Sequence, residues 1–140
     1  MEYKRFDQTI VLRVQRGEEL LTSIHKVAEA ENISLASVTG IGACDEVKLG
    51  FYQLSTHEYN ESVYQEDLEL TSLVGNITEK DQAYYGHFHA TFGREDNSVI
   101  GGHLVSARVS VTGEIIIHCL PGQVNRQADQ ETGINLLSFE

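Results

Sequence analysis

The chain has 140 residues, 41% hydrophobic and 22% charged, a composition typical of a globular protein rather than a disordered one. Ten Lys and Arg against 21 Asp and Glu give a net charge of −11, which disfavours contact with DNA phosphates and anionic membranes. The length suits one domain over residues 1–140. We find no signal peptide and no apolar run near the ~20 residues of a membrane span, so we expect a cytoplasmic protein.

Apolar and β-branched runs predict about eight strands, separated by polar or glycine-containing turns. After the first strand, apolar residues at helical spacing predict one helix over residues 18–32. The strands are expected over residues 9–14, 33–38, 47–54, 68–78, 83–92, 99–111, 114–120 and 134–139, with further strand ends around a turn in residues 55–67. The sequence therefore predicts an α+β fold, a mainly antiparallel twisted sheet with one principal helix packed on it.

Glycines mark the points where this pattern is expected to change. Gly40 and Gly42 favour a close backbone approach or a β-bulge. Residues 93–98 predict a polar turn, and Thr112-Gly113 a tight turn. Two cysteines are too few for a disulfide framework, and each lies in an apolar stretch, so we expect both to be buried thiols in a reducing compartment.

Three histidines are the strongest functional signal. His87 and His89 are one residue apart on a predicted strand and therefore point to the same face. His103 lies across the predicted hairpin. It shares their face only if Phe92 pairs with Ile100, and we expect a bulge at Gly101-Gly102 to supply that register. Three imidazoles converging from two strands would form a site for zinc.

Three protein ligands leave the fourth tetrahedral position of zinc open for water or substrate, as in catalytic sites. Glu114, which begins the next predicted strand, is the candidate general base. A surface carboxylate at a strand end is the competing interpretation of Glu114. The competing interpretation of the histidines is a zinc-free assembly domain in which the rings only form hydrogen bonds.

At these residues the chain resembles the plant-and-prokaryote-conserved domain, which in plants follows AT-hook motifs in nuclear proteins. The resemblance is carried by His87-Phe88-His89-Ala90, Gly101-Gly102-His103-Leu104 and Glu114-Ile115-Ile116-Ile117. Further matches are Arg13 with Gly17-Glu18, Gly40-Ile41-Gly42-Ala43, Leu73-Val74-Gly75-Asn76, and Arg126 with Asp129 through Gly133. The similarity extends over nearly the whole chain.

The resemblance implies an antiparallel sheet assembled as a homotrimer, with zinc held by His87, His89 and His103 near a subunit interface. It also implies a DNA-binding or regulatory label. This chain departs from the plant pattern because it has no Arg-Gly-Arg-Pro AT-hook, and aspartate stands for arginine in Glu66–Thr71, the stretch that plant members use with partner proteins.

The sequence thus supports a trimeric zinc-binding protein with a binding or regulatory role. The alternative is a zinc-dependent hydrolase or lyase acting on a small polar substrate. Arg13 and Arg126 are further pocket candidates, since either could pair with a small anionic ligand. For each of them, a structural salt bridge is the competing interpretation.

Overall fold

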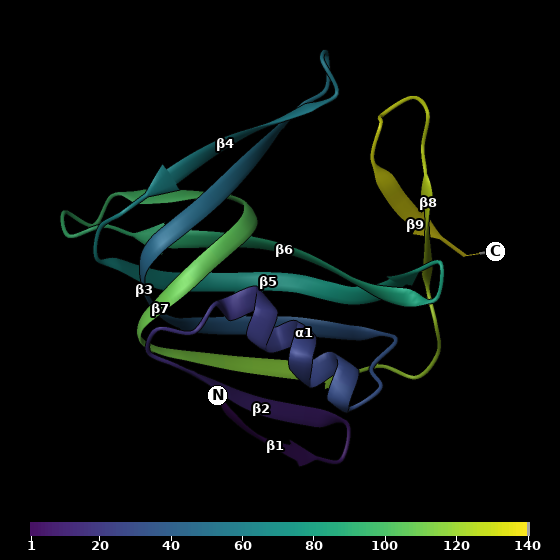
Figure 1. Cartoon of the computed structure of the whole chain (residues 1–140), viewed down its shortest axis with the longest axis horizontal. Coiled ribbons are helices and arrows are strands. Elements are labelled where there is room, and N and C mark those ends of the chain that lie inside the picture. Colours follow the sequence, from purple (N-terminus) through teal and green to yellow (C-terminus); the bar gives the residue numbers. More distant parts are fainter. Residues whose placement is uncertain (140) are drawn as a thin grey trace.

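Nine strands and one helix form among residues 1–139, the part of the chain that the computed structural model describes. The elements are β1 (Glu2–Phe6), β2 (Thr9–Gln15), α1 (Leu20–Ala30), β3 (Ala36–Gln53), β4 (Glu58–Tyr64), β5 (Leu68–Lys80), β6 (Ala83–Gly93), β7 (Val99–Cys119), β8 (Asn125–Ala128) and β9 (Asn135–Ser138). The first seven strands form one sheet in the order β1-β2-β7-β6-β5-β3-β4, and β8 and β9 form a separate hairpin (Figure 1). The mainly antiparallel sheet with one helix confirms the predicted α+β class.

The two longest strands, β3 and β7, hold the sheet together. They pair with each other along most of their length, while β3 also pairs with β4 and β5, and β7 also pairs with β2 and β6. Strands β3, β5, β6 and β7 are therefore each paired on both sides, and the sheet curls back on itself. The sequence pattern predicted two strands in each of these long segments, and this division is wrong.

Glycines explain why the sequence pattern predicts two short strands where the structure has one long strand. Gly42 and Gly113 are paired where β3 meets β7, and a Cβ atom at Gly42 would lie 2.2 Å from the Thr112 carbonyl oxygen. A Cβ atom at Gly113 would lie 3.2 Å from the side chain of Leu20 on the helix. Gly113 thus allows close packing inside a continuous strand rather than a tight turn. The bulge predicted at Gly40 and Gly42 is confirmed by a shift of register between them.

The helix begins at Leu20 rather than residue 18 because Glu19 caps it. The Glu19 carboxylate accepts hydrogen bonds from the backbone N–H groups of Leu21 (3.1 Å) and Thr22 (2.6 Å), and from that of Ala107 on β7 (3.0 Å). The cap therefore also fixes the helix to the sheet. The helix buries Leu20, Ser23, Ile24, Val27 and Ala28 against it.

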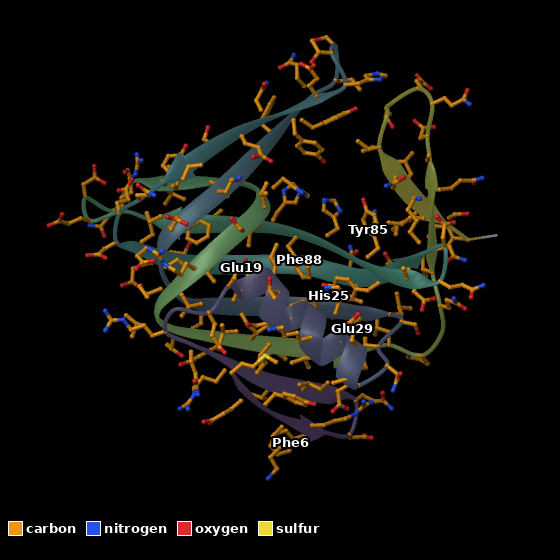
Figure 2. The ribbon with its side chains drawn as sticks, viewed as in Figure 1. Phe6, Glu19, His25, Glu29, Tyr85 and Phe88 are labelled. Carbon is orange, nitrogen blue, oxygen red and sulfur yellow. The ribbon has the colours of Figure 1, made fainter. Side chains whose placement is uncertain are left out.

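The two faces of the sheet differ in exposure. The covered face, which is the face under α1, carries the core and includes Phe88 (Figure 2), which is 3% exposed. Phe92, four residues further along β6, is 0% exposed. The opposite side, the open face, carries Val11, Ile41, Val74 and Ile116, which are 40–56% exposed. Alternation along the strands thus puts one apolar surface in the core and leaves a second one in solvent.

The C-terminal hairpin of β8 and β9 stands at one end of the sheet, beside β5 (Figure 1). The backbone N–H of Glu79 donates to the Val124 carbonyl (3.1 Å). Near the tip of the β3–β4 hairpin, the Tyr52 hydroxyl donates to the Thr132 carbonyl, which links the two hairpins. Strand β8 was missed because its segment is polar and pairs only with β9. Within residues 1–139, no helix is long and apolar enough to cross a membrane.

Candidate metal centre

The register of the β6–β7 hairpin places the third histidine. His89 pairs with His103 and Phe92 pairs with Ile100, as the sequence analysis required for a shared face. The pairing is regular at Gly101 and Gly102, so the bulge predicted there is wrong. The register comes instead from the turn over residues 94–98, closed by a hydrogen bond from the Arg94 N–H to the Ser98 carbonyl (2.8 Å).

The three histidine side chains converge on the open face of the sheet. One ligand nitrogen from each of His87, His89 and His103 lies within 4.8 Å of the others. The ring centroids are separated by 5.2 Å for His87 and His89, 5.3 Å for His87 and His103, and 5.6 Å for His89 and His103. This spacing allows the three nitrogens to share one ion.

The donor atoms fit a metal ion. Within residues 1–139, the one buried side-chain nitrogen or oxygen without a hydrogen-bond partner is Nδ1 of His103. An unsatisfied buried polar atom is costly, and this one belongs to one of the three clustered histidines. Imidazole nitrogens without thiolates suit zinc, copper, iron and nickel.

Burial favours the neutral form of two of these rings, those of His87 and His103, and the neutral form is the one that binds a metal. Burial, with further contributions from His103, Arg126 and His89, lowers the pKa of His87 to about 4. Burial, together with His89, also lowers the pKa of His103. At neutral pH both rings therefore keep a free electron pair for coordination.

Two tyrosines form an aromatic wall beside the cluster. The ring of Tyr59 lies 5.1 Å from that of His103, and the ring of Tyr52 lies 4.9 Å from that of Tyr59. Gly50 leaves room for this wall, because a Cβ atom there would lie 3.2 Å from Tyr59 Cδ1. Burial raises the pKa of Tyr59, followed by smaller effects of Tyr85 and Tyr52, so its hydroxyl stays protonated. Sequence reasoning did not predict Tyr59 as a site residue. The one feature that could have indicated it is its pairing with Tyr52 across the β3–β4 turn.

Arg126 reaches the neighbourhood of the histidines from β8. Its guanidinium is buried and donates to Thr78 Oγ1 (2.9 Å), Asn76 Oδ1 (2.9 Å) and the Asn135 carbonyl (3.1 Å). It also lies 4.6 Å from the ring centroid of Tyr85, which Figure 2 shows on the side of β6 toward the hairpin. Asn76 pairs directly with His87 across β5 and β6, so Arg126 lies close to the cluster.

Glu114 and Arg13 are placed elsewhere. They pair with each other across β2 and β7 and line an open groove of about 590 Å³, which also includes Ile41 and Ile116. Arg13 forms an exposed ion pair with Glu2 (3.0 Å). Glu114 does not belong to the ligand group, so the structure does not bring the predicted general base to the histidines. Glu114 follows His103 on β7 only after the strand has bent toward β2, so its role as a general base stays a prediction for a residue placed outside the ligand group.

A curled antiparallel sheet with three histidine nitrogens converging on its open face defines a candidate metal-binding domain. The chain belongs to the Plants and Prokaryotes Conserved (PCC) domain family, whose model matches residues 1–121. The family resemblance carried by the histidine and glycine motifs is thereby confirmed.

Solved structures share this fold over almost the full length. A protein from Bacteroides thetaiotaomicron, described as a "putative dna binding protein", is 28% identical with a TM-score of 0.96, covering 99% of this chain and 96% of its own. A metal-containing protein from Archaeoglobus fulgidus is 32% identical with a TM-score of 0.87, covering 96% and 95%. A plant- and prokaryote-conserved protein from Pyrococcus horikoshii is 32% identical with a TM-score of 0.86, covering 98% and 93%. A search of curated proteins gave no match.

Proposed function

We propose that His87, His89 and His103 bind one zinc ion and that the protein works as a zinc-dependent binding domain. The observation that carries the proposal is the convergence of three histidine nitrogens within 4.8 Å. It is supported by the unpartnered Nδ1 of His103 and by a 32% identical relative described as metal-containing. Bound zinc would offer an open coordination position with Lewis-acid character.

A binding role is better supported than the alternative of a zinc-dependent hydrolase or lyase with a carboxylate base. Among residues 1–139, no aspartate or glutamate belongs to the ligand group. The polar groups beside the histidines are instead the tyrosine hydroxyls and the Arg126 guanidinium. These groups can hold and orient a ligand, and at neutral pH they donate protons to hydrogen bonds rather than remove them.

Metal analysis of protein purified without a histidine tag tests the proposal. We expect about one zinc per chain, and less than about one per three chains would contradict a dedicated site. His103→Ala should abolish zinc retention. His118→Ala is the matched control, because His118 is an exposed histidine on the same strand that bonds Thr9 and lies outside the cluster. Equal zinc in both variants would also contradict the proposal.

We further propose that the chain assembles as a homotrimer through its open face. The exposed apolar side chains of Val11, Ile41, Val74 and Ile116 gather along the groove there, and burying them would be favourable. Sedimentation equilibrium should give about three times the 15.6 kDa chain mass, and Val74→Asp should yield monomers. A wild-type monomer at micromolar concentration would contradict this assembly. His103→Ala should leave the trimer intact.

Direct DNA binding is not part of the proposal, although two of the similar solved structures carry that description. Six of the ten basic side chains already form ion pairs with carboxylates, and the net charge is −11. Few cations remain to replace the counterions of a phosphate backbone. A gel shift over a salt series should show no binding even at low salt. A complex that weakens steeply as salt rises would instead establish a DNA interface.

A further inference from the structure

We propose that the histidine site binds a small organic carboxylate, held between the metal ion and the guanidinium of Arg126. The proposal rests on the zinc site proposed above and names the class of ligand that the site takes. Arg126 lies outside the residues that the family model matches.

The first support is a buried cation for which residues 1–139 provide no counter-ion. Arg126 is only 8% exposed, and no carboxylate within residues 1–139 forms an ion pair with it. Its partners are one hydroxyl, one amide oxygen, one backbone carbonyl and the face of Tyr85. Burying a charge among neutral groups is costly unless an opposite charge compensates it. These three hydrogen bonds use three of the five N–H groups of the guanidinium, so two remain for a ligand.

The second support is the sign of the charge around the cluster. Imidazole ligands are neutral, so a divalent ion on the three histidines keeps its whole charge. Arg126, beside Asn76 and hence beside His87, adds one more positive charge. Within residues 1–139, no carboxylate belongs to the ligand group to offset them. This part of an otherwise acidic protein is therefore positive and favours a small anion, whereas the surrounding acidic surface repels a polyanion.

The third support concerns the body of the ligand. The rings of Tyr59 and Tyr52 lie beside His103, and the ring of Tyr85 lies under Arg126. Aromatic faces offer apolar contact to a carbon skeleton, whereas inorganic phosphate gains little from them. A planar carboxylate also matches the fork of an arginine side chain. These features favour an organic carboxylate over inorganic phosphate.

Cobalt substitution makes the proposal measurable without any assay of activity. The protein would be loaded with Co²⁺ and titrated with acetate, and the visible absorption of the cobalt would report binding at the metal. Arg126→Gln removes the charge and should weaken acetate binding roughly tenfold or more, the size expected for a lost hydrogen bond to a charged group. Arg5→Gln is the matched control and should bind acetate like the wild type, since Arg5 is exposed on β1 and paired with Glu31 (3.0 Å).

The outcomes separate this inference from the zinc proposal. If the wild type binds no cobalt, the zinc proposal fails and this inference fails with it. If cobalt binds but Arg126→Gln binds acetate like the wild type, only the inference is overturned. Tighter binding of inorganic phosphate than of acetate would overturn the carboxylate assignment.

A second measurement covers the case in which Arg126→Gln does not fold. The side-chain Nε–H signal of Arg126 in the zinc-loaded wild type should move during an acetate titration, with the midpoint seen for the cobalt protein. An Arg126 signal that does not move while acetate binds would overturn the inference.

Discussion

The covered face and the open face of the sheet are built from the same strands but differ in what their side chains do. Under α1, Phe88, Ala90 and Phe92 on β6 are buried and contribute to the core. The other side of the same strand presents Tyr85, whose ring lies under Arg126. It also presents two of the candidate metal ligands, His87 and His89. The comparison shows that alternate residues of one strand are divided between stability and chemistry.

The two faces also contribute to stability in different ways. The covered face is stabilised by apolar burial and needs no ligand. The candidate site on the open face contains two half-buried imidazoles, those of His87 and His103, and the Nδ1 of His103 has no hydrogen-bond partner. It also contains the buried guanidinium of Arg126, for which residues 1–139 provide no counter-ion. These groups lower the free energy of unfolding of the free chain. Binding of a metal ion and an anion would raise the free energy of unfolding again.

The largest expected effect is on the covered face. Phe92→Ala should lower the free energy of unfolding by about 3–5 kcal/mol, because Phe92 is fully buried and its removal leaves a cavity. Urea unfolding followed by circular dichroism measures the change. Val63→Ala, at a 57% exposed position on β4, should change stability by less than about 0.5 kcal/mol. Equal losses in the two variants would contradict the core assignment.

The next largest effect is the change in the free energy of unfolding when zinc binds. Zinc at a hundred times its dissociation constant should raise the free energy of unfolding by about 2.7 kcal/mol, provided that the unfolded chain does not bind it. Thermal unfolding with and without zinc measures this gain. The gain should vanish in His103→Ala and persist in His118→Ala. A zinc effect of the same size in His103→Ala would place the ion elsewhere.

A smaller effect is expected from acid on the metal-free chain. Burial lowers the pKa of His87 to about 4 and lowers that of His103, while unfolded histidine titrates near 6.5. Between these values the unfolded chain binds more protons, so this stability is present above about pH 6.5 and is lost as the pH falls toward 4. Because the rings are partly open to water, we expect a total loss of about 1–2 kcal/mol.

Urea unfolding of metal-free protein at pH 7 and pH 5 tests the acid effect. His87→Gln should reduce the difference in stability between the two pH values, and the exposed His118→Gln should not. An unchanged difference in His87→Gln would mean that other groups cause the acid sensitivity.

The smallest expected effect is at the cysteines of the covered face. Both thiols are buried and free, and burial, with added effects of Asp45 and Glu19, raises the pKa of Cys44 to about 12. Iodoacetamide at pH 8 should therefore leave Cys44 unmodified in the native protein and alkylate it after unfolding, as seen by mass spectrometry. Rapid alkylation of the native chain would show that this part of the core opens readily.

Local patterns correctly predicted the antiparallel sheet, the helix and the convergence of the three histidine side chains. The shared face of His87 and His89 follows from strand alternation alone, whereas the pairing of Phe92 with Ile100 is set by the turn over residues 94–98. The patterns failed where distant segments set the structure. Gly113 suggested a turn because its packing against Leu20 on the helix is invisible in the local sequence.

The same limit applies to the rest of the candidate site. The sequence indicates Arg126 as a pocket candidate, but its place beside His87 depends on a polar hairpin whose docking no local pattern indicates. Glu114 follows His103 in the sequence within one strand. Because β7 bends between them, closeness in the sequence does not predict closeness in space, and Glu114 lines the groove instead. Tyr59 lies in a polar, acidic segment with no marker of its role.

The three histidines all lie within residues 87–103, in one hairpin closed by the turn over residues 94–98. Hairpins of this kind form in about 1–10 μs, whereas the pairing of β3 with β7 must close a loop between segments far apart in the chain. A metal ion can therefore capture the hairpin before the long-range pairing exists. The ion would then act as a folding nucleus, and its presence during refolding should speed the appearance of the native state rather than only slow its loss.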